Sequence, residues 1–222
     1  KETNNMERTI KVTGKGKISV KPDRIRLYIT QQASEKTYEK VIQESADKKR
    51  SINEVLKDIG FKNEDLKTLQ VNVDTEYDEY RDNDNHWRKT FKGYRYMHRM
   101  KLEFPADNMI LSKVLGALMK CPAKPEFSIE YTIADPEASK NELLGNAVAD
   151  SREKAEVLTR AAGVKLKDIL TIDYSWGEMD FAVRPMMLEA RCMVEEGAGV
   201  NMDIEADDIH VTDTVTVIWG IE

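Results

Sequence analysis

The sequence contains little cysteine, no long apolar run and no excess of positive charge, and each shortage excludes a class of protein. Only two of its 222 residues are cysteines, so it is not a small scaffold held together by disulfides. Its longest apolar stretch, residues 109–119, is interrupted by polar residues, whereas a membrane helix needs about 20 mostly apolar residues. We therefore expect no transmembrane segment.

Positive charge is outnumbered by negative charge. The chain has 34 Lys and Arg against 40 Asp and Glu, a net charge of −6, so it exerts no long-range attraction on a phosphate backbone and nucleic acid is not an expected partner. Set against about 150 residues per domain, the length fits one large domain or two small interlocked ones. We predict one domain over residues 1–222, with residues 1–7 as a flexible N-terminal tail.

Catalytic, metal-binding and cofactor motifs are also missing. The three histidines are scattered, and the chain has no H-E-x-x-H or C-x-x-C pattern. Residues 82–85, Asp-Asn-Asp-Asn, lack the glycine and closing glutamate of a calcium loop, so we interpret them as a solvated hairpin tip. Gly14 and Gly16 lack the third glycine and the helix of a dinucleotide site, and we interpret them as a bend between strands. We predict no catalytic residue, no metal ligand, no cofactor and no enzymatic activity.

Two features bear on the compartment of the protein. The chain begins with Lys1 rather than Met and opens with a polar run, so we expect that a leader was removed by processing or in preparing the chain. Cys121 and Cys192 belong to no metal-binding pattern. Either both are unpaired thiols, or they form the disulfide that an oxidising compartment would permit; both alternatives stay open.

The order of apolar and polar residues predicts an α+β fold. Strands with period-two alternation are predicted over residues 10–12, 18–20, 25–29, 69–77, 94–104, 127–133, 171–176 and 209–219. Long amphipathic helices are predicted from Ser34 to Gly60 and from Asp135 to Gly163, and a short one ends at Met119. The chain thus forms two strand-helix-strand halves, with the long helices packed on antiparallel sheet.

The strands at 69–77 and 94–104 predict a hairpin with a defined register. Apolar residues occupy odd positions in the first strand and even positions in the second. For both sets to share a face, directly opposed residue numbers must add up to an odd number, and an acidic row then faces a basic row. His98 lies on the apolar face, where we interpret it as a core histidine rather than a ligand.

The two long helices end alike. Gly60–Leu69 aligns with Gly163–Ile172 without a gap, and a glycine, a lysine, an aspartate and a threonine are identical. This similarity indicates that a strand, helix, glycine turn and strand unit occurs twice, although a helix-stop glycine followed by a capped turn also arises independently.

Several segments resemble a known family in their order along the chain. They are Ile10-Lys11-Val12-Thr13-Gly14-Lys15-Gly16, Val20-Lys21-Pro22-Asp23, Gly60 with Leu66 and Gln70-Val71, Gly93-Tyr94, Asp135-Pro136-Glu137-Ala138, Ala161-Ala162-Gly163-Val164 and the last strand, Ile209 to Trp219. This series is similar to the SIMPL-domain family, which includes bacterial periplasmic immunogenic proteins. The region from Tyr174 to Asp208 shows little of the family pattern.

The resemblance implies an exported protein, periplasmic or associated with the outer membrane. It further implies homo-oligomers, sometimes ring-like, no agreed enzymatic activity and a loose association with oxidative-stress defence. The family offers no catalytic residues to carry over, because its signature positions are turn glycines, a bend proline and helix caps. We therefore expect a non-enzymatic, self-associating protein of the cell envelope.

Residues 173–208 differ in composition from the rest of the chain. Their ten acids and two bases give a charge of −8, which leaves +2 for the remainder, and they hold five of the ten methionines: Met179, Met186, Met187, Met193 and Met202. A connection as long as residues 177–206 is usually functional or mobile, and methionine adapts to irregular surfaces. We predict a subunit or partner contact over residues 181–194, through Phe181, Met186, Met187, Leu188 and Met193. The equal alternative is a flexible loop partly folded over its own core.

A second class of function is consistent with the same methionines. They could bind a small ligand or a soft metal such as Cu(I), or be oxidised reversibly as a redox sink.

Removing the methionine-rich segment tests the predicted contact. Deleting residues 186–200 should disrupt assembly, because the deletion removes most of the apolar side chains of the segment. Size-exclusion chromatography of the deletion variant and the full chain measures the effect, and an unchanged elution position, apart from the small loss of mass, would contradict the prediction.

Overall fold

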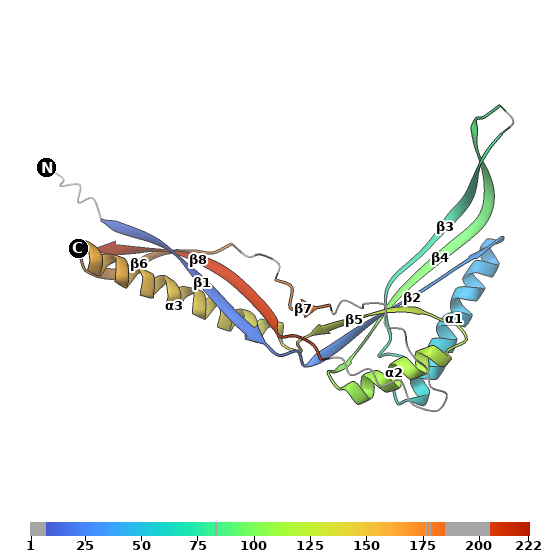
Figure 1. The fold of residues 1–222 in the computed structure, drawn as a ribbon, viewed down its shortest axis with the longest axis horizontal. Helices are drawn as coiled ribbons and strands as arrows, with labels where there is room; N and C mark the ends of the chain where they lie inside the picture. Colours follow the sequence, from blue (N-terminus) through green and yellow to red (C-terminus); the bar gives the residue numbers. More distant parts are fainter. Residues whose placement is uncertain (1–7, 83, 176, 178, 185–204) are drawn as a thin grey trace. The chain divides into compact units, whose positions relative to one another are not determined.

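The computed structural model describes residues 8–82, 84–175, 177, 179–184 and 205–222 (Figure 1). It divides into two compact units, and each takes separate stretches of the chain. The first comprises Lys1–Pro22, Ile133–Val183 and Asp207–Glu222, and the second comprises Asp23–Thr132 and Arg184–Ala206. The predicted α+β class is confirmed, since both units combine antiparallel strands with helices. The single domain over residues 1–222 stays a prediction, and the predicted tail, residues 1–7, lies outside the described residues.

The first unit is a three-stranded antiparallel sheet with one long helix. Its strands lie in the order β1 (Thr9–Val20), β8 (Ile209–Ile221) and β6 (Leu166–Asp173). The stretches of chain that form this unit also include the short β7 (Ala182–Val183), which is not a strand of this sheet. Helix α3 (Pro136–Ala162) runs along one face of the sheet (Figure 1). The buried side chains form two clusters: Val12, Ala147, Ala155, Val215, Val217 and Trp219, and Ile18, Ile133, Leu143, Phe181, Ile209 and Val211.

Helix α3 begins and ends at the residues that the sequence predicts. The Asp135 carboxylate accepts a hydrogen bond from the Ala138 amide at 3.0 Å, and Pro136 occupies the first turn, where no backbone N–H is needed. Gly163 ends the helix with a φ of 69°, a left-handed conformation that favours glycine. The local sequence therefore determines both ends of this helix.

Gly14 and Gly16 do not form the predicted bend between strands. Both lie inside β1, on the face that α3 covers, and β1 pairs with β8 without interruption from Thr9 to Val20. A Cβ atom at Gly14 would overlap the carbonyl oxygen of Ala147, and one at Gly16 would overlap that of Leu143. The two glycines are therefore required because the α3 backbone lies directly on this strand, which is a tertiary cause that the local sequence does not show.

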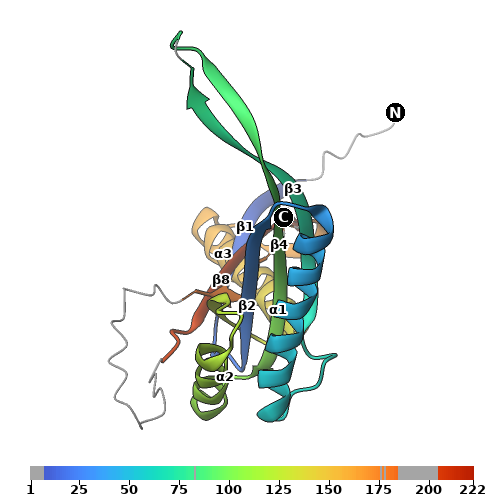
Figure 2. The same ribbon diagram turned by 90° about the vertical axis from the view of Figure 1, so that its right-hand side faces the viewer.

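The second unit is a larger antiparallel sheet covered by two helices. Its strands β3 (Lys67–Arg81), β4 (Trp87–Pro105), β2 (Arg24–Glu35) and β5 (Glu126–Thr132) lie in this order. Helices α1 (Tyr38–Asp58) and α2 (Asn108–Lys120) cover one face of the sheet (Figure 2). Their apolar sides pack on a core that includes Ile25, Leu27, Ile29, Ile52, Leu56, Met100, Leu102, Phe104, Leu111 and Leu115.

Two predicted boundaries are wrong. Helix α1 was predicted to begin at Ser34, but Ser34 lies in β2, and the helix begins at Tyr38 after Thr37. The strand continues past Ser34 because β4 pairs with it as far as Glu35. Likewise, β6 starts at Leu166 rather than at residue 171, because β8 pairs with it from Ile221 onward. Strand pairing thus sets both of these boundaries.

The predicted register of the β3–β4 hairpin is confirmed over its regular part. From Gln70 opposite Arg99 to Glu76 opposite Gly93, all directly opposed residue numbers add up to an odd number. The register shifts at a bulge at Leu69 and again beyond Glu76. The predicted acidic and basic rows also meet, since Asp74 lies opposite Arg95. At the second register shift, Lys92 lies 3.3 Å from Glu76 and 3.4 Å from Asp78.

The strand and helix order recurs in the two units. In each, a long helix ends at a glycine with positive φ, at Gly60 and Gly163, and leads into an edge strand, β3 or β6. A later strand of the chain, β4 or β8, lies between that edge strand and β2 or β1 in the sheet. The repeated unit that the sequence predicts is therefore present as a repeated arrangement.

A substitution at Gly14 tests the close contact between β1 and α3. The Gly14→Ala variant should lower the free energy of unfolding by about 1–3 kcal/mol, because the new methyl group overlaps the Ala147 carbonyl oxygen. Gly145→Ala is the matched control: it lies on α3 with nothing within 4 Å of the added Cβ, and it should stabilise by up to about 1 kcal/mol. Urea denaturation measures both changes, and equal effects would contradict the proposed contact.

Candidate functional site

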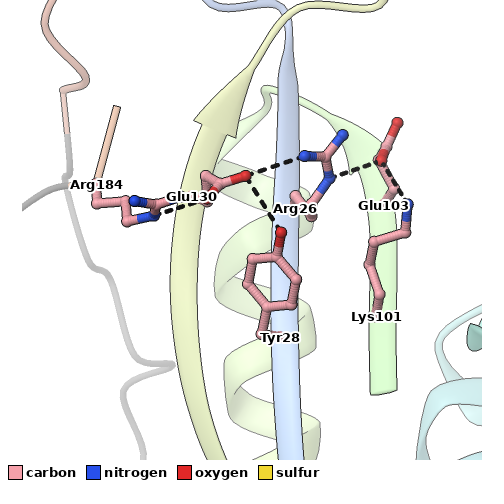
Figure 3. Close-up of polar contacts among 6 residues, drawn as sticks. All are labelled: Arg26, Tyr28, Lys101, Glu103, Glu130 and Arg184. Atoms are coloured by element: carbon pink, nitrogen blue, oxygen red, sulfur yellow. Dashed lines mark hydrogen bonds and ion pairs between the residues drawn. The ribbon is translucent and has the colours of Figure 1, made fainter. Parts of the chain in front are cut away.

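The face of the second unit's sheet opposite the helices carries a buried ion cluster centred on Glu130. This β5 carboxylate is 2% exposed, and three side chains donate hydrogen bonds to it (Figure 3). Arg26 Nη1 and the Tyr28 hydroxyl, both from β2, lie 3.0 and 3.4 Å from Oε1, and Arg184 Nε lies 2.8 Å from Oε2. Each oxygen of Glu130 therefore has at least one donor, and the buried charge is compensated.

The cluster extends across the sheet through Arg26. Its Nε donates to Glu103 Oε2 on β4 at 3.1 Å, and Lys101 Nζ lies 3.5 Å from the same carboxylate. Burial by itself would lower the pKa of Arg26, but hydrogen bonds to Glu103 and Tyr28 outweigh it and raise the pKa. Burial would likewise raise the pKa of Glu103, but Arg26 outweighs it and lowers the pKa. The cluster thus stabilises charged forms and spans three strands.

A cavity of about 500 Å³ adjoins this cluster. Arg99 lies over the Tyr28 ring, 4.8 Å from its centroid, and the other lining residues are Phe127, Ser128, Ile129, Glu130 and Arg184. Glu130 is the carboxylate of this lining, and guanidinium groups already occupy it. The arrangement is therefore suited to holding three strands together rather than to moving a proton to or from a substrate.

The β3–β4 hairpin carries a second, exposed feature, which we call the aromatic strip. Four rings follow one another edge to face: Tyr38 and Tyr94 at 5.6 Å, Tyr94 and Phe91 at 5.4 Å, and Phe91 and Tyr77 at 5.8 Å between centroids. Tyr38, Phe91 and Tyr77 are 51%, 46% and 51% exposed. The strip starts at Tyr38, the first residue of α1, and its other three rings belong to β3 and β4. These two strands form a hairpin that extends beyond α1 (Figure 2).

The tip of the hairpin is held by Asp82. Its Oδ1 accepts hydrogen bonds from the amides of Asp84 and His86, and its Oδ2 accepts from Arg88 Nε at 2.8 Å. The bond from Arg88 is the main reason that the pKa of Asp82 is lowered. Asp82, Asp84 and His86 form a close group of potential ligands, but Asp82 serves the turn. The predicted hairpin tip is confirmed at Asp82, Asp84 and Asn85, which lie between β3 and β4, and Asn83 lies outside the described residues.

Strand β3 forms an exposed edge of the second unit's sheet. β4 pairs with one side of β3, and the sheet order places no described strand on its other side. Leu69 and Val71 are about half exposed, although their alternation predicts a covered apolar face. The helix that would cover this face, α1, lies over β2 and β4 instead. Edge strands with exposed apolar side chains are sites where another strand can add.

The predicted interaction residues fall in different places. Phe181 is buried in the core of the first unit beside Ile133 and Leu143, and Met186, Met187, Leu188 and Met193 lie outside the described residues. Cys121 is a buried thiol, whereas Cys192 also lies outside the described residues.

The histidines are as scattered in the fold as in the sequence. His98 is buried on the face under α1, where its Nε2 lies 2.9 Å from the Thr68 hydroxyl, so its interpretation as a core histidine is confirmed. Burial, with a smaller effect from Lys49, lowers its pKa. His86 is exposed at the hairpin tip, and His210 is exposed on β8 of the other unit.

Sequence reasoning missed both the Glu130 cluster and the aromatic strip. The alternation in β5 places Glu130 on a polar face, but only the pairing of β5 and β4 with β2 brings Arg26 and Glu103 to it. The strip likewise joins Tyr38, from the start of α1, to three hairpin rings. The sequence shows the period-two pattern that places aromatic residues on one face of the hairpin. It does not show whether a helix covers that face.

The fold and these features define the class of protein: an α+β protein of two sheet-and-helix units, with a compensated ion cluster and an exposed aromatic hairpin. In the described part of the chain, no helix is both long and apolar enough to cross a membrane. The sequence profile of the SIMPL family, described as a protein of unknown function (DUF541), matches residues 10–219. The chain therefore belongs to the SIMPL family.

A curated relative matches nearly the full length of the chain. It is the "26 kDa periplasmic immunogenic protein" of Brucella melitensis biotype 1, which is 23% identical over 216 residues; the match covers 96% of this chain and 84% of that protein. The family resemblance that the ordered motifs indicate is thereby confirmed.

Neutralising Glu130 tests the structural role of the ion cluster. The Glu130→Gln variant should lose about 1–3 kcal/mol of unfolding free energy, since Arg26 and Arg184 lose a buried counter-charge while remaining partly exposed. Glu126→Gln is the control on the same strand: Glu126 accepts one hydrogen bond, from Gln32, at an exposed position, and its loss should be within about 0.5 kcal/mol. Equal losses in chemical denaturation would contradict this role.

Proposed function

We propose that this chain is a non-enzymatic, exported protein of the cell envelope that associates with copies of itself. The observation that carries the proposal is the aromatic strip, in which Tyr38, Phe91 and Tyr77 are each about half exposed in a continuous row. Aromatic rings contribute large areas to interfaces, and tyrosine is enriched among the residues that dominate binding energy. Contiguous exposed apolar surface of this kind marks interaction sites.

The envelope location rests on similarity. The relative from Brucella melitensis is named a periplasmic protein, and the family match extends over residues 10–219. The non-enzymatic role is supported by the Glu130 cluster, because the carboxylate that lines the polar cavity is already bound by two arginines. General acid or base catalysis requires a group with an exchangeable proton within reach of substrate, and this cluster instead serves to join strands.

The link to oxidative-stress defence and the alternative role in Cu(I) or redox chemistry stay predictions. Both depend on the methionines of residues 177–206. Met179 packs partly buried against the first unit's core, and Met186, Met187, Met193 and Met202 lie outside the described residues. Titration with Cu(I) under reducing conditions, with a Met186/Met187/Met193 triple substitution as comparison, addresses the metal version.

Light scattering coupled to size exclusion tests self-association. At micromolar concentration the protein should have a mass that is a multiple of 25.4 kDa, and a Tyr77→Ser/Phe91→Ser variant should shift toward the monomer, because the strip loses two rings. Tyr80→Ser is the matched control, since Tyr80 is equally exposed but lies on the opposite face of the hairpin. A strictly monomeric wild-type protein would contradict the proposed function.

A further inference from the structure

The regular part of β3 has a sequence that is complementary to itself. Between the bulge at Leu69 and Glu76, the strand reads Gln70-Val71-Asn72-Val73-Asp74-Thr75-Glu76. Of the described helices and strands, β4 is the one that packs extensively against it. Its outer edge therefore presents backbone groups that a further strand can pair with.

An antiparallel copy of this segment fits the edge when the two-fold axis passes through Val73. Asn72 then lies opposite Asp74 of the second copy, and Gln70 lies opposite Glu76 of the second copy. Each carboxylate thus faces an amide, which can donate a hydrogen bond to it. On the other face Val71 lies opposite Thr75, and Val73 lies opposite itself, so β-branched side chains meet across the interface.

Other registers are less complementary. An axis through Asp74 places two carboxylates directly opposite each other, which is destabilising. An axis through Asn72 shortens the pairing to residues 70–74, because the bulge at Leu69 ends the regular edge. A shift by one residue places Val71 opposite an acid, Asp74 or Glu76, and mixes the polar and apolar faces. Only the axis through Val73 uses the full regular segment without a like-charge pair.

The ends of this pairing bring further apolar side chains together. Tyr77, the next residue after Glu76, would lie beside Leu69 of the second copy at each end of the interface. Leu69 and Tyr77 are 48% and 51% exposed, and Tyr77 belongs to the aromatic strip. In an interface with two-fold symmetry each contact occurs twice. Because Leu69 and Tyr77 directly flank the paired residues, the two ends and the central pairing form one continuous surface.

We infer that β3 pairs antiparallel with β3 of a second copy of this chain, with the two-fold axis at Val73, and so joins two second-unit sheets into one. This inference rests on the proposed self-association and names the surface that produces it. The partner is specified by the amide and carboxylate pairs and by the length of the regular edge.

Cysteine crosslinking tests the register. In a Cys192→Ser background, where the remaining Cys121 is buried, a Val73→Cys variant should form a disulfide-linked dimer under mild oxidation, because opposed Cα atoms of paired strands lie about 4.5–5.5 Å apart. Thr75→Cys is the control on the same face: its copy would lie four residues away along the strand, about 13 Å, which is beyond disulfide reach. Crosslinking of both variants to the same extent would overturn the register.

A charge test complements the crosslinking. Asn72→Asp places like charges opposite each other at two symmetric positions and should weaken dimerisation by about tenfold. The Asn72→Asp/Asp74→Asn variant restores an acid-amide pair and should recover dimerisation, whereas Thr171→Asp, on the exposed edge strand β6 of the first unit, should change nothing.

The outcomes separate the interface from the proposed function. If light scattering shows wild-type oligomers but Val73→Cys does not crosslink, the β3 interface is wrong and the proposed function stands. A monomeric wild type refutes both.

Discussion

The second unit depends on the position of β2, which is paired on both of its edges. Residues 24–35 pair with β4 and residues 24–30 pair with β5, both antiparallel. Because alternate side chains point to opposite faces, the same strand supplies Ile25, Leu27 and Ile29 to the core under the helices and Arg26 and Tyr28 to the Glu130 cluster. Core packing and charge compensation are thus fixed by one register.

The first unit obeys a different constraint, the close approach of a helix to a strand. Gly14 and Gly16 leave room for the α3 backbone at Ala147 and Leu143, so helix and strand touch without an intervening side chain at these two positions. Apolar residues of β8, including Val215 and Val217, complete the core beside this contact. The repeated strand order of the two units is therefore stabilised in two distinct ways.

The exposed hairpin follows from the difference in length between helix and strands. β3 and β4 continue beyond the start of α1, so the apolar alternation that would otherwise be covered remains at the surface (Figure 2). Tyr77 and Phe91 then pack on each other and on Tyr94 rather than under a helix. Natural edge strands are protected from pairing by charged residues and bulges, and β3 has both. Beyond the bulge at Leu69, however, seven regular residues remain, and they can pair with a second copy of themselves without placing like charges opposite each other.

The sequence by itself determined the α+β class, most strands, the hairpin register around Val73, the caps of α3 and the family, because these depend on local periodicity and on turn and cap chemistry. Only the tertiary structure decided that Ser34 belongs to a strand, that Gly14 and Gly16 adjoin a helix, that Glu130 meets Arg26 and Arg184, and that the aromatic strip stays exposed. These depend on which elements lie beside one another and where each ends. Contacts between residues far apart in the chain determine both the neighbours of an element and its ends. A local sequence pattern contains no information about such contacts.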